Sequence, residues 1–190
     1  MKTLRKQVSE ALVSRGFERD RRAHRKRVDA DFWLCVDTGV IGPIADIAPF
    51  VGFRSDAVED ARADLMGLPR DPWVASAIGN VGYVLGGEYK HWLGGTAPAL
   101  VVDTIFKGLD ALEPFMSLPT VDGVFAHRWA FASPGAPYVL VVAALLNGDA
   151  GLVQRRLADA EARLCAQQDE VCEQFQEFKA RVLERLADRR

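Results

Sequence analysis

The hydrophobic pattern of this chain changes its period at Gly94-Gly95, near the midpoint. Before this point, apolar residues alternate over short runs, as in residues 32–41, which is typical of strands. After it, apolar residues recur every three or four positions over longer stretches, which is typical of helices. We therefore predict an α+β fold: an antiparallel sheet built mainly from the N-terminal half, packed with helices, and a helical C-terminal third.

Local signals place the elements of the N-terminal half. In order, we expect a helix over 2–14, a hairpin over 17–27, strands over 32–41 and 46–54, a helix from Ser55 to Gly67, a strand over 75–85 and its hairpin partner over 88–93. Ser55 is a favourable N-cap residue, and Gly67 suits the left-handed conformation in which many helices end.

The C-terminal half is expected to be helical throughout. Thr96 is the expected cap of a helix with Pro98 in its first turn, and a short helix over 120–129 and a buried helix over 138–146 follow. Asp149 is the expected cap of a polar helical segment that runs to the end of the chain. Because Gln167-Gln168 interrupts its apolar stripe, this segment is either one long helix or two helices bent near Gln167.

Length and composition favour one domain over residues 1–190, with a strand-rich part over 1–95 and a helical part over 96–190. The chain has 190 residues, of which 49% are hydrophobic, so it can bury a substantial core. The formal net charge of −2 does not indicate a nucleic-acid or membrane partner for the whole chain. No signal peptide and no run of about 18 apolar residues is evident, so we expect a cytoplasmic protein that does not enter a membrane.

The cysteines and histidines show no metal-binding spacing, and no cofactor motif is present, so we expect neither a metal nor a cofactor. Cys165 and Cys172 lie seven residues apart on an expected helix. Two helical turns would separate them by about 10 Å, which is too far for a disulfide. Together with Cys35 they are expected to be reduced thiols.

An aromatic segment between two glycine pairs is the expected binding site. Tyr89, His91 and Trp92 lie between Gly86-Gly87 and Gly94-Gly95. If exposed, such residues would form a protein-binding hot spot, because Trp and Tyr dominate these sites. If buried, they would be core residues, and the sequence alone leaves both alternatives open.

The same segment carries the one faint catalytic pattern. Asp71, Glu88 and Lys90 resemble the acidic residues and lysine of metal-dependent nucleases, in which two carboxylates hold Mg²⁺ and the lysine orients water. This gives a first alternative function, a metal-dependent nuclease. The competing interpretation is a solvated hairpin with a surface ion pair, because Glu-x-Lys is common by chance.

A basic run between Arg15 and Arg27 gives a second alternative function, nucleic-acid binding. The cations that would contact the nucleic acid are Arg19, Arg21, Arg22, Arg25 and Lys26. We favour a solvated strand edge and do not expect a nucleic-acid partner. Glu18, Asp20 and Asp29 interrupt the run, and few aromatic residues are available to stack on bases.

Four segments resemble a group of small bacterial proteins of unknown function. They are LRKQVSEALVSRGFERDRRAHRKR, DFWLCVDTGV, VVDTIFKGLDALEPFMSL and LLNGDAGLVQRRLADAEARL. Some members of this group are encoded beside polymorphic toxins and are regarded as immunity proteins. The resemblance implies a cytoplasmic α+β binding protein without enzymatic activity, and it carries over no functional residues. The near-neutral charge departs from the acidic surface often used to neutralise a nuclease toxin.

The predicted function is therefore a non-catalytic protein-binding domain. The resemblance gives this hypothesis a specific form, in which the protein is an immunity protein that occludes a toxin. Tyr89, His91 and Trp92 are the expected contact residues.

Overall fold

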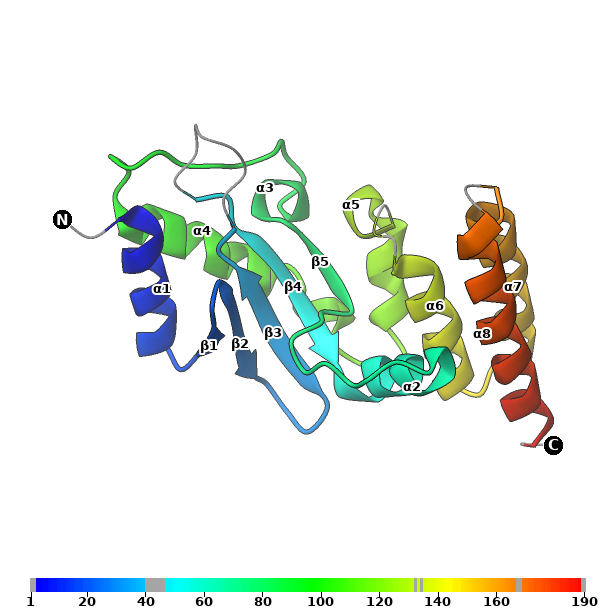
Figure 1. The fold of residues 1–190 in the computed structure, drawn as a ribbon. Coiled ribbons are helices and arrows are strands. Elements are labelled where there is room, and N and C mark those ends of the chain that lie inside the picture. Colours follow the sequence, from blue (N-terminus) through cyan, green and yellow to red (C-terminus); the bar gives the residue numbers. More distant parts are fainter. Residues whose placement is uncertain (1–2, 40–46, 132, 134, 167–168, 189–190) are drawn as a thin grey trace.

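The computed structural model describes residues 3–39, 47–131, 133, 135–166 and 169–188. Within these residues, five strands form one antiparallel sheet in which each strand pairs with the next along the chain (Figure 1). The strands are β1 (Glu18–Asp20), β2 (Ala23–Arg27), β3 (Phe32–Asp37), β4 (Phe50–Ser55) and β5 (Ala77–Asn80). The predicted antiparallel sheet from the N-terminal half is confirmed.

Helices precede, interrupt and follow the sheet. They are α1 (Leu4–Ser14), α2 (Asp56–Met66), α3 (Val81–Val84), α4 (Pro98–Asp110), α5 (Arg128–Phe131), α6 (Ala136–Leu146), α7 (Ala150–Leu164) and α8 (Asp169–Ala187), with 3-10 turns η1 (Glu113–Phe115) and η2 (Val121–Ala126). The chain is therefore α+β, with a helical C-terminal region as predicted.

Helices α1 and α4 lie side by side on one face of the sheet (Figure 1). Strand alternation directs Val36, Val51 and Phe53 to this side, where all three are buried. Gly108 allows α4 to approach β4 closely, because a Cβ there would lie 3.0 Å from a methyl group of Val51. This layer contains the core of the N-terminal half.

The opposite face of the sheet carries polar and aromatic side chains, and the loop between α2 and β5 crosses it (Figure 1). The guanidinium of Arg25 lies 4.3 Å from the ring centroid of Trp33 and 4.5 Å from that of Trp73, which this loop contributes. Arg54 is 3% exposed and forms ion pairs with Asp56 and Asp60. Arg54 Nη1 also donates to Asp71 O and Val74 O of this loop, so Arg25 and Arg54 together fasten the loop to the sheet.

The helical half is built around α6, which packs against α2 and α7. Its residues from Ala136 to Leu145 are all buried, which confirms the predicted core helix. Tyr138 of α6 stacks edge to face on Phe178 of α8, with ring centroids 5.0 Å apart. Helices α7 and α8 form a hairpin at the end of the molecule away from α1 (Figure 1). Apolar side chains from both halves join in one continuous core.

Helix boundaries that depend on local signals are confirmed. The Ser55 hydroxyl accepts a hydrogen bond from Val58 N at 3.2 Å, and Gly67 ends α2 with a φ of +67°. The Asp149 carboxylate likewise accepts a hydrogen bond from Leu152 N at 2.8 Å at the start of α7. The predicted cap at Thr96 is wrong by one residue, because Ala97 occupies the N-cap position of α4.

Two expectations for the region between β4 and α4 are wrong. The strand predicted over 75–85 ends at Asn80, where the chain turns into α3. Residues 88–93 form no strand, and only Trp92 pairs its backbone, in an isolated bridge with Ile47. The physical reason is that the Asn80 side chain, instead of a neighbouring strand, takes up the backbone groups of Lys90.

Several other boundaries differ from the predicted ones. The expected strand over 32–41 ends at Asp37, and the one expected over 46–54 begins at Phe50. Residues 40–46 and Gln167-Gln168 lie outside the described residues. The polar C-terminal segment forms two helices, so the second of the two alternatives is correct. No helix in the described part of the chain is long and apolar enough to cross a membrane.

Candidate protein-binding site

The side chain of Asn80 fixes the path of the aromatic segment. Its Oδ1 accepts hydrogen bonds from Gly82 N at 3.0 Å and Lys90 N at 2.8 Å. Its Nδ2 donates to Lys90 O at 2.9 Å and to Pro49 O at 3.3 Å. The residue is 1% exposed, so these bonds are shielded from water. One buried amide thus joins β4, α3 and the segment around Lys90.

Two further contacts hold this segment close to the sheet. A Cβ on Gly82 would collide with the carbonyl oxygen of Glu88, so the close return of the chain requires glycine there. Farther along, Trp92 N donates to Ile47 O at 2.9 Å, and Ile47 N donates to Trp92 O at 3.3 Å. The segment is therefore fixed at both ends although few of its residues are buried.

Four rings gather on this fixed segment. The Tyr89 ring lies 6.4 Å from Phe50, 5.9 Å from Tyr83 and 6.2 Å from His91, measured between centroids. Burial is the main cause that raises the pKa of the Tyr89 phenol, and the neighbouring Tyr83 adds a smaller increase. The phenol therefore stays neutral. Tyr83 and His91 are the exposed members of the group, and 45% of the surface of Tyr83 is accessible.

A second aromatic wall faces Tyr83 from α5. His127 stacks on Trp129 with a centroid distance of 6.4 Å, and Phe115 contacts His127 edge to face at 5.5 Å. Trp129 is half-buried and lies over β5 at Gly79, where a Cβ would collide with the indole ring. His127 and the adjacent Arg128 are exposed.

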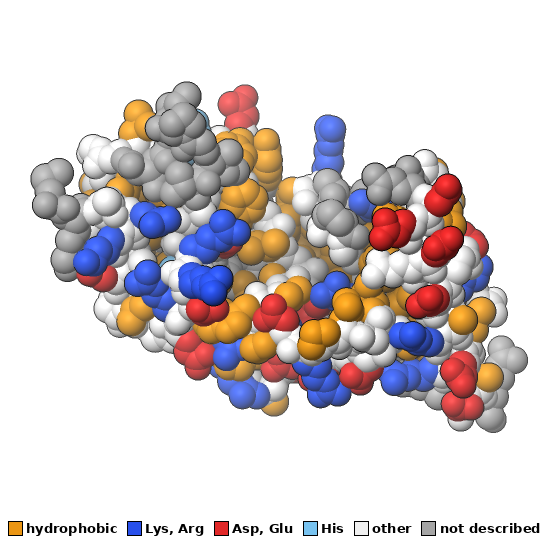
Figure 2. Space-filling model, in the orientation of Figure 1, with side chains coloured by type: hydrophobic (Ala, Val, Ile, Leu, Met, Phe, Trp, Pro, Cys, Tyr) orange, Lys and Arg blue, Asp and Glu red, His pale blue; other side chains and the backbone are white. Residues whose placement is uncertain are grey.

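A pocket of about 620 Å³ lies between these two walls and is here called the aromatic pocket. It is lined by Tyr83, Gly86, Gly87, His127, Arg128 and Trp129. Figure 2 shows this face of the molecule hollowed between the sheet half and the helical half, with hydrophobic side chains beside the hollow. The lining combines flat apolar rings with one permanent positive charge, which suits an apolar or aromatic side chain next to an anionic group.

The three predicted contact residues differ in accessibility. His91 is exposed and Tyr89 is half-buried beneath Tyr83. Trp92 packs against the core and its backbone forms the bridge to Ile47, so it anchors the segment and is not an open contact residue. Sequence reasoning missed Arg128 and Trp129 as parts of the site, because no local signal brings α5 beside α3.

The structure brings together only part of the basic run, and Lys26 lies apart, where its Nζ donates to Arg15 O at 3.0 Å. Arg19, Arg21 and Arg22 lie together at a groove beside α1. Arg25 lies on the opposite face of the sheet, held by Trp33 and Trp73, and it donates to Pro72 O at 2.9 Å. Arg25 is thus a structural residue of the sheet and does not share a site with the other three.

The residues of the nuclease alternative are not brought together. Asp71 lies at the Arg54 end of β4, because Arg54 Nη1 donates to Asp71 O at 2.7 Å. Lys90 lies beside Asn80, which pairs with Phe50 at the other end of β4. Four residues of strand separate these ends by about 13 Å. No cluster of three or more His, Cys, Asp or Glu side chains that could hold a metal ion occurs among the described residues.

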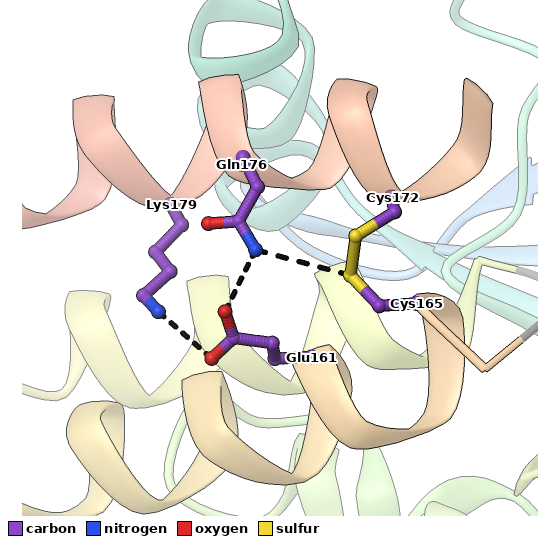
Figure 3. The surroundings of a disulfide bond; sticks show 5 residues. All are labelled: Glu161, Cys165, Cys172, Gln176 and Lys179. Atoms are coloured by element: carbon purple, nitrogen blue, oxygen red, sulfur yellow. Dashed lines mark hydrogen bonds and ion pairs between the residues drawn. A yellow bond between two sulfur atoms is a disulfide. The ribbon is translucent and has the colours of Figure 1, made fainter. Parts of the chain in front are cut away.

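The expectation of three reduced thiols is wrong for two of the cysteines. Cys165 and Cys172 form a disulfide, with Cα atoms 4.3 Å apart (Figure 3). The 10 Å estimate assumed one continuous helix, whereas Cys165 ends α7 and Cys172 belongs to α8. Cys35 is a free, buried thiol, and burial raises its pKa to about 12, so it is protonated and unreactive at neutral pH.

Comparisons with protein-family models, with curated proteins and with solved structures each found no significant match to this chain. The geometry of the site is therefore the basis for a functional proposal. The resemblance to immunity proteins stays a prediction.

Proposed function

We propose that this chain is a protein-binding domain whose partner inserts a side chain into the aromatic pocket. The observation that carries the proposal is the exposed Tyr83 ring, which faces Trp129 across a preformed pocket. Tyr and Trp are the residue types that contribute most at protein interfaces, particularly in concave and well-packed positions. The hydrogen bonds of Asn80 hold one wall in place before binding, which lowers the entropy that a partner must offset.

The charges at the aromatic pocket indicate the kind of partner. Arg128 is exposed at its edge, and no carboxylate is among its lining residues. A partner that places an apolar or aromatic anchor between Tyr83 and Trp129, with a carboxylate beside it, would satisfy both features. In the immunity form of the proposal, binding at this surface covers the active site of a toxin.

The cytoplasmic location also belongs to the proposal. Disulfides are rare in a reducing cytoplasm and persist in oxidising compartments. If Cys165 and Cys172 are reduced in cells, a cytoplasmic location is supported, and if they form the disulfide, an oxidising compartment is indicated. Binding at the aromatic pocket does not depend on the outcome, because the disulfide lies in the α7–α8 hairpin.

Affinity capture from the cells that encode the protein tests the proposal. Tagged wild type, Tyr83→Ser and Leu183→Ser are compared, because Tyr83 and Leu183 are 45% and 42% exposed and lie on different surfaces. We expect one protein to be enriched with wild type and Leu183→Ser and lost with Tyr83→Ser. Equal recovery by all three chains, or recovery of nothing specific by wild type, contradicts the proposal.

The immunity form has its own test. The captured partner is expressed alone and together with this chain, and cell growth is measured. We expect growth arrest by the partner alone, growth with wild type, and arrest again with Tyr83→Ser. A partner that leaves growth unchanged removes the immunity function and leaves the binding proposal standing.

A further inference from the structure

A second concave surface lies at the other end of the sheet, between the first turns of α1 and the β1–β2 turn. Five cationic side chains line this groove, which is here called the basic groove: Arg5, Lys6, Arg19, Arg21 and Arg22. Its volume is about 860 Å³, larger than that of the aromatic pocket. Figure 2 shows Lys and Arg side chains gathered on this part of the face, over α1 and the first strands.

The strand period explains how an interrupted sequence yields a cationic surface. Arg19 pairs with His24 and points toward α1, whereas Glu18 and Asp20 alternate to the opposite face. There the Glu18 carboxylate forms an ion pair with Arg25 at 3.0 Å. Glu18 and Asp20, which interrupt the run in the sequence, are therefore directed away from the basic groove.

Buried hydrogen bonds fix the two walls of the basic groove to each other. The Ser9 hydroxyl of α1 is 2.7 Å from His24 Nε2 of β2, and both residues are buried. At the β1–β2 turn, Arg22 O accepts hydrogen bonds from Thr38 N and Thr38 Oγ1, each at 3.0 Å. The cationic side chains thus project from a backbone that is held in one arrangement.

Most of this positive charge has no ion-pair partner among the described residues. Arg22 forms an ion pair with Asp37 at 3.1 Å, whereas the side chains of Arg5, Lys6 and Arg21 make no ion pair with any described residue. The N-terminal end of α1 adds the partial positive charge of the helix dipole at the same place. Repulsion among these groups is a cost that a bound polyanion would remove.

We propose that the basic groove binds the phosphate backbone of a nucleic acid without regard to base sequence. Cations on both walls match an anion whose charges repeat along its length, and the groove is large enough for several phosphates. None of its described lining residues is aromatic, so these residues offer bases no stacking surface, and contacts to phosphates alone do not discriminate sequence. This surface is separate from the aromatic pocket, so the two proposals stand independently.

Fluorescence anisotropy with labelled oligonucleotides of about 20 nucleotides, in two unrelated sequences, tests this proposal through the salt dependence of binding. We expect similar affinities for both sequences at about 50 mM salt. The logarithm of the binding constant should fall with that of the salt concentration, with a slope of about −3 to −4, as expected for four contacted phosphates.

Two double variants locate the site. Arg5→Gln/Arg21→Gln removes two exposed cations of the basic groove that form no ion pair with a described residue, and Arg155→Gln/Arg185→Gln removes two exposed cations from α7 and α8. We expect the first pair to reduce the slope by about 2 and the affinity by about tenfold or more. The second pair should leave the slope within about 0.5 of wild type, and unfolding midpoints should confirm that both variants fold.

Three results would overturn the proposal. The first is no binding even at low salt, and the second is an equal loss in both double variants, which would indicate attraction by net charge alone. The third concerns competition by polyglutamate that carries the same charge as an unlabelled oligonucleotide. If polyglutamate competes as strongly as the oligonucleotide, the basic groove is assigned to an acidic protein segment. Tyr83→Ser is measured in the same assay. If it binds the oligonucleotides as wild type does, the basic groove acts independently of the aromatic pocket, and failure of one proposal does not imply failure of the other.

Discussion

The side-chain amide of Asn80 bonds to both backbone groups of Lys90, accepting from its N–H at 2.8 Å and donating to its carbonyl at 2.9 Å. This arrangement reproduces, with one side chain, the pair of bonds that a neighbouring strand would make. It allows the segment after β5 to leave the sheet and present its rings while its polar backbone groups remain satisfied.

Replacing Asn80 should destabilise the protein and loosen the aromatic wall. Asn80→Ala leaves the buried N–H of Gly82 and the partly buried backbone groups of Lys90 without this partner, so we expect a loss of about 3 kcal/mol in the free energy of unfolding. Denaturant unfolding measures the loss, and hydrogen exchange should be faster at the amides of Gly82 and Lys90. Asn147→Ala, which removes one exposed hydrogen bond to Leu118 O, should cost about 1 kcal/mol or less. Equal losses in the two variants would contradict this role of Asn80.

Gly79→Ala should displace Trp129 and close the aromatic pocket. A methyl group there would collide with the indole ring, so we expect a loss of about 1–3 kcal/mol in stability, a shift in tryptophan fluorescence and weaker partner capture. Gly151→Ala is the matched control, because its Cβ would lie 3.5 Å from the Asp149 carboxylate, an ordinary contact, in the first turn of α7. An unchanged fluorescence spectrum in Gly79→Ala would show that Trp129 does not lie on β5.

Reduction of the Cys165–Cys172 disulfide should weaken the protein without unfolding it. The bond closes a short loop, so its loss should lower the free energy of unfolding by about 2 kcal/mol. The α7–α8 pair keeps other links, because Glu161 accepts hydrogen bonds from Gln176 at 2.7 Å and Lys179 at 2.8 Å (Figure 3). Unfolding is measured with and without reductant, and Cys165→Ser/Cys172→Ser should not respond to it. An equal response in this variant would rule out the disulfide as the cause.

The buried His24 predicts a pH dependence of stability. Burial lowers the pKa of His24. The hydrogen bond to Arg22 O raises it in part, and the charge of Arg19 lowers it more weakly than burial does. Because the unfolded state, with a His pKa of about 6.5, binds the proton more readily, this stability is complete above pH about 6.5. It is lost as the pH falls toward the folded pKa, by up to about 1.4 kcal/mol per pH unit.

Unfolding at pH 7.5 and 5.5 measures this loss. His24→Gln should lose less stability than wild type between these two values, by about 1 kcal/mol, because the neutral amide does not titrate. His91→Gln, which alters an exposed histidine, should lose as much as wild type. Parallel pH profiles for wild type and His24→Gln would mean that His24 is not the group responsible.

The sequence predicted elements whose signals are local. Ser55, Gly67 and Asp149 mark helix ends through their own hydrogen bonds or backbone conformation, and each does so in the structure. It also predicted the sheet, because the apolar residues within 32–41 and the cluster of Phe50, Val51 and Phe53 are typical of strands. These features require no knowledge of distant residues.

The remaining features depend on contacts between distant residues. Tyr83 and Trp129 are far apart in the sequence, and only the placement of α5 over β5 brings them to one pocket. The disulfide could have been anticipated from Gln167-Gln168, since a break between the cysteines places them on two antiparallel helices. Predicting the basic groove would have required the strand register, because only the register places Arg19 on the opposite face from Glu18 and Asp20.

Site-specific photo-crosslinking in the cells that encode the protein tests the central claim most directly. A photoreactive phenylalanine analogue replaces Tyr83 in one chain and Leu183 in another, and covalent adducts are identified by mass spectrometry. We expect one discrete protein adduct from position 83, absent from position 183 and lost when Gly79→Ala is added to the chain. No adduct at position 83, or the same adduct from both positions, would contradict a partner at the aromatic pocket.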